Sequence, residues 1–219
     1  AQQLETALVL TGSPSPLTWR IASIINAKHL VLLPESKAWL IEFLKTKQTN
    51  LALTVAFLGA TGGVGTSTLA LTVAKHFTSE GKRVAVVDLD FTSVGMQIAA
   101  GADHSPGLTW SSLSELAVAA EPLALFESMP IMHGVRILAN ESLTDAVAPD
   151  VVRETLVKLQ NAADVLVIDA GKWNQSAQLL VDFPCSKFLA VPNTVRACAV
   201  AREIYADSRN TDLQLVIRE

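Results

Sequence analysis

Four glycines lie close together where an apolar segment ends, and this is the sharpest chemical feature of the sequence. They are Gly59, Gly62, Gly63 and Gly65, in the run Val55-Ala56-Phe57-Leu58-Gly59-Ala60-Thr61-Gly62-Gly63-Val64-Gly65-Thr66-Ser67-Thr68. A strand that passes through such a loop into a helix lets backbone N–H groups converge, and the helix dipole adds positive potential. A tight turn alone would not need four glycines. The pattern therefore predicts a phosphate-binding loop.

One interpretation of the loop is a dinucleotide-binding site. Gly59, Gly62 and Gly65 form a GxxGxxG pattern, and an acid lies about twenty residues further on, at Asp88 or Asp90, where such sites bind a ribose hydroxyl. This interpretation predicts an NAD(P)-binding reductase.

The other interpretation is a P-loop NTPase. Gly59 and Gly65 are separated by five residues and followed by Thr66-Ser67, so Ser67 could bind Mg²⁺. A P-loop normally carries a lysine directly before that serine, where it reaches the β- and γ-phosphates. Thr66 stands there instead, so binding could survive while catalysis suffers.

The loop resembles the deviant Walker A motif of the MinD/ParA ATPases. Its letters are Thr61-Gly-Gly-Val-Gly-Thr-Ser-Thr-Leu-Ala, with Thr61 in place of the signature lysine and Thr66 in place of the P-loop lysine. This double replacement resembles the CpaE/TadZ branch of the family. The resemblance implies that ATP would be bound by Thr61, Gly62, Gly63, Val64, Gly65, Thr66, Ser67 and Thr68.

Two further strands carry aspartates that the same resemblance interprets. Val86-Val87-Asp88-Leu89-Asp90 is similar to the switch I strand, whose second aspartate, here Asp90, positions the attacking water. The segment 164–169, which ends at Asp169, is similar to the Walker B strand. The resemblance implies an Mg²⁺ site at Ser67, Asp88 and Asp169, partly through water. The family's proline-containing switch II is replaced by Ala170-Gly171-Lys172-Trp173, so weak or lost ATPase activity is expected.

The flanking segments resemble a narrower group, the actinobacterial CpaE-like proteins linked to septum-site determination or to secretion. The similar segments are residues 27–40, 105–110 and 195–202. The resemblance implies a homodimer that positions the division septum or a Tad-pilus secretion machine through partner proteins. It also implies a cytoplasmic location, peripheral at the inner face of the plasma membrane or the cell pole. A nucleotide-independent pseudo-ATPase scaffold is the alternative within this fold.

Alternating strands and helices must position these residues. Apolar runs predict strands, and 3.6-residue periodicity with Gly and Pro punctuation predicts helices. The strands are predicted at 53–59, 84–88, 135–139, 164–169, 187–191 and 213–217, and the helices at 67–79, 149–161, 174–182 and 196–208. Such alternation is typical of an open, mostly parallel α/β sheet with helices on both faces.

The chain is predicted to divide near residues 45–50. Residues 1–46 read as β-α-β-α, which resembles the C-terminal part of a receiver-like domain, with strands at 6–11 and 29–33. The resemblance implies that residues 51–219 form a MinD/ParA-like ATPase domain. We expect this domain to be truncated at its C-terminus, because the chain stops directly after its last strand.

Composition excludes several other classes. Of 219 residues, 50% are hydrophobic and 17% charged, which excludes disorder, and the net charge of −4 argues against a nucleic-acid partner. Residues 48–74 carry no charge, but the apolar run before the glycines is too short for a membrane span of about 20 residues. Cys185 and Cys198 lack metal-ligand spacing. The cofactors that the resemblance implies are ATP and Mg²⁺.

Overall fold

The chain forms two compact units, Ala1–Thr49 and Asn50–Glu219. They are taken from a computed structural model that describes residues 7–11, 14–24, 29–39, 51–93, 96–100, 106–116, 120–140, 147–173, 178–180, 182–206 and 213–218. Each unit is described by itself below.

The first unit contains two parallel strands and the helix that connects them. The strands β1 (Ala7–Thr11) and β2 (His29–Leu33) pair in parallel, and α1 (Pro16–Ile24) lies between them in sequence. Thr18 N–H donates to Ser15 Oγ at 3.3 Å, which caps the first turn of α1. The second predicted helix, around residues 39–45, falls almost entirely outside the described residues. The receiver-like assignment of residues 1–46 stays a prediction.

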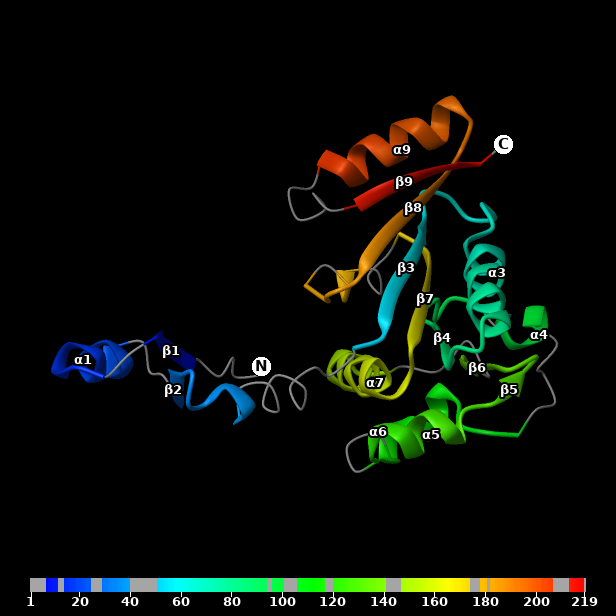
Figure 1. Ribbon diagram of the computed structural model, residues 1–219. Helices are drawn as coiled ribbons and strands as arrows, with labels where there is room; N and C mark the ends of the chain where they lie inside the picture. The colour runs from blue at the N-terminus through cyan, green and yellow to red at the C-terminus, as the bar shows by residue number, and fades with distance from the viewer. Residues whose placement is uncertain are drawn as a thin grey trace. The chain divides into compact units, whose positions relative to one another are not determined.

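The second unit is built on a seven-stranded, mostly parallel sheet (Figure 1). Its strands are β3 (Leu53–Gly59), β4 (Val84–Asp88), β5 (Ile131–Met132), β6 (Val135–Leu138), β7 (Val165–Lys172), β8 (Ser186–Pro192) and β9 (Leu213–Arg218). Their order across the sheet is β5-β6-β4-β7-β3-β8-β9, and only β5 pairs antiparallel. The carboxyl ends of β3, β4, β7 and β8 therefore lie at one edge, where ligands bind in open α/β sheets.

Helices cover both faces of this sheet, as the sequence predicts. The helices of one face are α3 (Thr66–Ser79) and α4 (Met96–Ala100), and those of the other are α5 (Trp110–Leu116), α6 (Pro122–Ser128), α7 (Pro149–Ala162) and α9 (Val195–Ala206). Each face has its own hydrophobic core. The α/β fold class is thereby confirmed.

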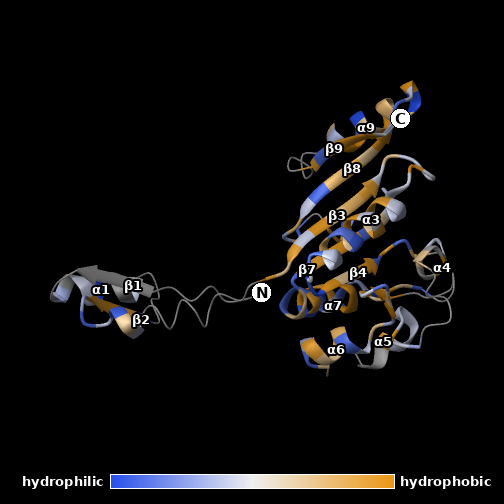
Figure 2. Ribbon diagram, turned by 45° about the vertical axis from the view of Figure 1, so that its right-hand side comes forward, coloured by the Kyte–Doolittle hydropathy of each residue, from blue (hydrophilic) through white to orange (hydrophobic). Residues whose placement is uncertain are grey.

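The two cores explain why the strands are continuously apolar. In β4, Ala85 and Val87 pack into the core beneath α5–α7 and α9, while Val84 and Val86 pack into the core beneath α3. All of β4 is buried, so neither set of side chains faces water. Figure 2 shows the same hydrophobic colouring along β3, β4 and β7.

The structure differs from the predicted elements in several places. Strand β7 does not end at Asp169 but continues to Lys172, so Gly171 belongs to the strand. The helix predicted over 174–182 falls mostly outside the described residues. The short elements β5, α5 and α6 were not predicted, because two to seven residues are too few to show a period. No helix in the described ranges combines the length and the apolarity that crossing a membrane requires.

Candidate functional site

The loop between β3 and α3 needs glycine at several positions for different physical reasons. A Cβ at Gly59 would lie 2.9 Å from Val64 Cγ1 and 3.0 Å from the Thr61 carbonyl oxygen, so the loop closes tightly over this residue. Gly63 and Gly65 have φ of +74° and +88°, a region that other residues enter at a cost. Gly62 has no atom within 4 Å of its Cβ position, so its bare backbone leaves open space.

Two neighbouring glycines give a matched test of this geometry. A Cβ would meet nothing within 4 Å at either Gly62 or Gly63, but only Gly63 has a positive φ. Gly63→Ala is therefore expected to lower the free energy of unfolding by about 1–2 kcal/mol, the cost of left-handed backbone for an L-residue. Gly62→Ala should change it by less than about 0.5 kcal/mol. Urea denaturation of both variants measures the difference, and equal stabilities would contradict the loop conformation.

Helix α3 begins one residue before Ser67. Gly65 occupies the N-cap position without a side-chain cap, and Leu69 N–H donates to its carbonyl at 2.9 Å. Ser67 is the second residue of the helix and is not its N-cap. Thr66, at the position of the missing lysine, is 8% exposed.

Two buried aspartates from neighbouring strands meet beside this helix start. Asp88 ends β4 and pairs in register with Asp169 of β7, and Leu89 N–H donates to the Asp169 carbonyl at 2.8 Å. Asp88 Oδ1 accepts from the Asp90 N–H at 2.9 Å, and Asp169 Oδ1 accepts from the Gly171 N–H at 3.0 Å. Asp169 Oδ2 is buried with no hydrogen-bond partner. An orphaned buried oxygen at this edge fits a site that a cation or its water would complete.

Burial makes both carboxyl groups hard to ionise. The pKa of Asp88 is raised to about 8, mainly by burial and in smaller part by the neighbouring charge of Asp169, while the hydrogen bond from the Asp90 N–H acts against the rise. The pKa of Asp169 is also raised, again mainly by burial, and the hydroxyl of Ser67 acts against this rise. The loop, Ser67 and Asp169 therefore belong to one electrostatic site.

Asp90 lies at the same edge but is engaged in the turn that follows β4. Its Oδ1 accepts from the N–H and the hydroxyl of Thr92, at 3.1 and 2.5 Å. A Cβ at Gly171 would lie 2.5 Å from Asp90 Oδ2, so Asp90 packs directly against β7. Asp90 thus caps this turn, and its role in placing water stays a prediction.

Trp110 and Asn140 support the aspartates from the adjoining core, and sequence reasoning assigned neither this task. The Trp110 indole N–H donates to the Asp88 carbonyl at 2.7 Å from a fully buried position. Asn140 Nδ2 donates to the Asp90 carbonyl at 3.4 Å. These bonds fix the backbone at the end of β4.

No group of three His, Cys, Asp or Glu side chains within the described ranges is arranged to hold a metal ion. Mg²⁺ is usually bound through one or two carboxylates plus waters and phosphate oxygens. Ser67, Asp88 and Asp169 as its ligands stay a prediction.

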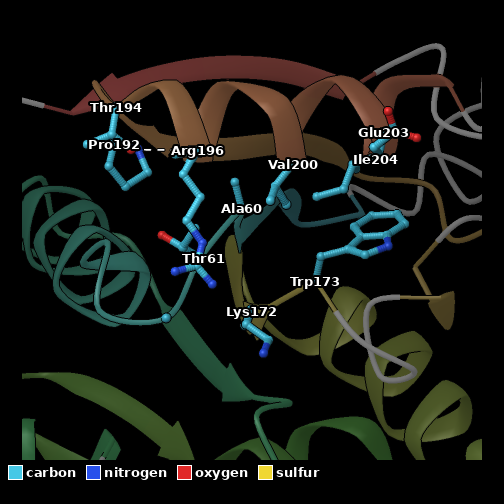
Figure 3. A pocket seen from close by; sticks show the side chains of 12 residues that line it. Ala60, Thr61, Lys172, Trp173, Pro192, Thr194, Arg196, Val200, Glu203 and Ile204 are labelled. Atoms are coloured by element: carbon cyan, nitrogen blue, oxygen red, sulfur yellow. Dashed lines mark hydrogen bonds between the residues drawn. The ribbon is translucent and has the colours of Figure 1, made fainter.

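A cavity of about 890 Å³ opens beside the glycine loop (Figure 3). It is lined by Ala60, Thr61, Gly62, Lys172, Trp173, Pro192, Thr194, Arg196, Ala197, Val200, Glu203 and Ile204. The loop forms one wall and α9 another, and Trp173 N–H donates to the Gly59 carbonyl at 2.9 Å. The sequence did not predict that α9 lines this cavity, because no local pattern shows that residues about 130 positions apart lie on opposite walls of it.

The strand order decides between the two interpretations of the loop. In dinucleotide-binding folds the strand after the glycine loop's helix pairs with the glycine-loop strand itself. Here β7 lies between β3 and β4, so the acids at the end of β4 are one strand removed from the loop strand. The NAD(P)-binding reductase interpretation is therefore wrong.

Several solved structures have a similar fold. The chain matches a ParA family ATPase from Chlorobium tepidum with a TM-score of 0.66 and 13% identity, covering 75% of this chain and 73% of that one. It matches MinD in the MinC:MinD complex of Aquifex aeolicus with a TM-score of 0.59 and 16% identity, covering 76% and 68%. The chain has the fold of the MinD and ParA ATPases. A third match is MinD complexed with Mg-ADP from Pyrococcus horikoshii, with a TM-score of 0.52, 18% identity and coverage of 75% and 68%.

Sequence comparison finds a relative that matches nearly the whole chain. An uncharacterized protein of Mycobacterium tuberculosis, found in two strains, is 25% identical over 220 residues, which cover 96% of this chain. The chain spans 62% of the length of these relatives. No protein-family model matches the chain.

Proposed function

We propose that this chain is the nucleotide-binding part of a MinD/ParA-like spatial-positioning protein of the CpaE/TadZ type. It would act in septum-site determination or in Tad-pilus and secretion assembly, with weak or lost ATPase activity. One observation carries the proposal: on a MinD/ParA fold, the glycine loop, Ser67 and the orphaned Asp169 Oδ2 converge at one edge of the sheet.

The residues present fit a nucleotide with Mg²⁺. The open backbone at Gly62 and the cavity beside it leave room for phosphates and a nucleoside. Ser67 and Asp169 would act on the cation, and the loop N–H groups would donate hydrogen bonds to the phosphate oxygens. When bound, the nucleotide supplies negative charge that differs between its di- and triphosphate forms, which can bias an equilibrium between two states.

Weak turnover follows from two features of this chain. Neither Thr61 nor Thr66 can place a positive charge on the phosphates, as a lysine would. Asp90, the candidate for orienting water, already accepts two hydrogen bonds from Thr92. The proposal is therefore a nucleotide-biased dimer that presents a surface to division or secretion partners, peripheral to the membrane, rather than a fast hydrolase.

The proposal is tested by calorimetric titration of the purified full chain with ATP–Mg²⁺, with NADPH as the control ligand. Extraction with acid first establishes whether the protein is already loaded. We expect saturable binding of ATP–Mg²⁺, no binding of NADPH, and weaker ATP binding when EDTA removes the metal. Light scattering with and without ATP–Mg²⁺ then tests whether the nucleotide favours a dimer.

The outcomes separate the candidate functions. Absence of heat with ATP–Mg²⁺, on protein shown to be free of nucleotide, would overturn the nucleotide switch and favour the pseudo-ATPase scaffold. Binding that does not depend on Mg²⁺ would contradict the assignment of Ser67 and Asp169 to a cation.

A further inference from the structure

The glycine loop has no positive charge of its own. Residues 48–74 contain no lysine, arginine or histidine, so only N–H dipoles and hydroxyls are available within the loop and the start of α3. A di- or triphosphate carries several negative charges, and charge-assisted hydrogen bonds are about twice as strong as neutral ones. A phosphate site here is incomplete unless cations reach it from elsewhere in the fold.

Helix α9 carries an arginine toward this loop. Thr194 caps the helix: its Oγ1 accepts from the Ala197 N–H at 3.2 Å, and its carbonyl accepts from the Cys198 N–H at 2.9 Å. The cap fixes where α9 starts and thereby the position of Arg196 in its first turn. Figure 3 shows the Arg196 side chain extending from α9 toward Thr61.

The spacing along α9 shows that Arg196 belongs to the wall of the cavity. Arg196, Val200 and Ile204 recur every four residues, so they share one face of the helix, and all three line the cavity. Val195, one residue earlier, is 90% exposed and does not line it. Arg196 therefore faces the glycine loop rather than only the solvent.

The charges around the cavity leave this arginine available. The side chains of Arg196 and of the exposed Lys172 make no ion pair or hydrogen bond within the part of the chain that the structure describes. The carboxylate that also lines the cavity, Glu203, is paired with the guanidinium of Arg202 at 3.2 Å. The cavity thus has two uncommitted cations beside a loop of N–H donors.

We propose that Arg196, assisted by Lys172, supplies the positive charge for the phosphates of a nucleotide bound at the glycine loop. The proposal rests on the proposed function, because it takes a nucleoside di- or triphosphate as the ligand. Lys172 is the weaker contributor: it ends β7 directly beside Gly59 in register, but its ammonium is a single hydrated point charge. The cations that the loop lacks thus come from the ends of β7 and α9.

The test compares binding of ATP–Mg²⁺ and of adenosine by calorimetry. The variants are Arg196→Gln, Arg196→Lys and, as the matched control, Arg153→Gln, which removes an exposed arginine from α7 away from the cavity. Arg196→Gln is expected to weaken ATP–Mg²⁺ binding about ten- to a hundredfold. It should leave adenosine binding unchanged and make ATP binding less dependent on salt. Arg196→Lys should restore part of the affinity, and Arg153→Gln should behave like the parent chain.

Each outcome has a distinct meaning. If the parent chain binds ATP–Mg²⁺ and Arg196→Gln binds it equally well, this inference fails while the proposed function stands. If Arg196→Gln weakens ATP and adenosine alike, Arg196 shapes the cavity rather than providing charge, which also overturns the inference. If the parent chain binds no nucleotide, the proposed function fails as well.

Discussion

Replacing Asp88 with asparagine is expected to make the protein more stable at pH 8, by on the order of 3 kcal/mol. Asp88 is 2% exposed and lies beside Asp169, and its pKa is raised to about 8. The folded protein therefore holds a proton that the unfolded chain releases near pH 4. Asparagine keeps the oxygen that accepts from the Asp90 N–H and carries no titrating proton.

The sign of the pH dependence follows from this raised pKa. Below about pH 4 both states are protonated and Asp88 does not reduce stability. As the pH rises from about 4 to about 8, the folded state binds more protons than the unfolded state, so the free energy of unfolding falls. Above about pH 8 Asp88 is ionised in both states, and its titration lowers the free energy of unfolding no further. Thermal unfolding from pH 5 to 9 should show this decline in the parent chain and a flatter profile in Asp88→Asn.

A second aspartate supplies a control of opposite sign. The pKa of Asp164 is lowered by its hydrogen bonds with Arg83, so its ionised form stabilises the folded state. Asp164→Asn should therefore reduce stability slightly at neutral pH rather than increase it. If Asp88→Asn is less stable than the parent at pH 8, the carboxyl is needed ionised or as a hydrogen-bond partner, and the argument from burial is wrong.

The strands could be predicted because they are buried on both faces. The expected ranges 53–59 and 84–88 coincide with β3 and β4, whose side chains enter two separate cores. Strand order could not be predicted, because all the strands have similar Val- and Leu-rich sequences. That order places Asp88 next to Asp169, which is 81 positions away in the sequence. The same order contradicts the reductase interpretation.

Gly171 shows why the end of β7 was misjudged. The strand was predicted to end at Asp169, and the φ of +60° at Gly171 is unusual for a strand. The Asp90 side chain occupies the place that a Cβ at residue 171 would need, so this position of the strand requires glycine. That contact joins two segments distant in sequence, so local pattern does not reveal it. For the same reason the sequence did not show that Arg196 lines the cavity beside the glycine loop, because that position depends on the packing of α9.

Restoring a lysine at position 66 is expected to raise the affinity for ATP–Mg²⁺ by about ten- to a hundredfold. Thr66 begins α3, where a P-loop places its lysine, and a lysine could extend from there along the loop to the phosphates. The matched control is Thr66→Met, which has similar length and no charge. Calorimetry of both variants separates charge from side-chain size, and equal affinities in two folded variants would contradict a relic Walker A loop.

Combining Thr66→Lys with Arg196→Gln tests whether the two cations serve the same phosphates. If Arg196 replaces the missing lysine, its loss should matter much less once Lys is present at position 66, so the two effects on ATP affinity should not add. Independent phosphate contacts would instead give additive effects. The cycle therefore distinguishes a loop that has merely lost its cation from one whose cation now comes from α9.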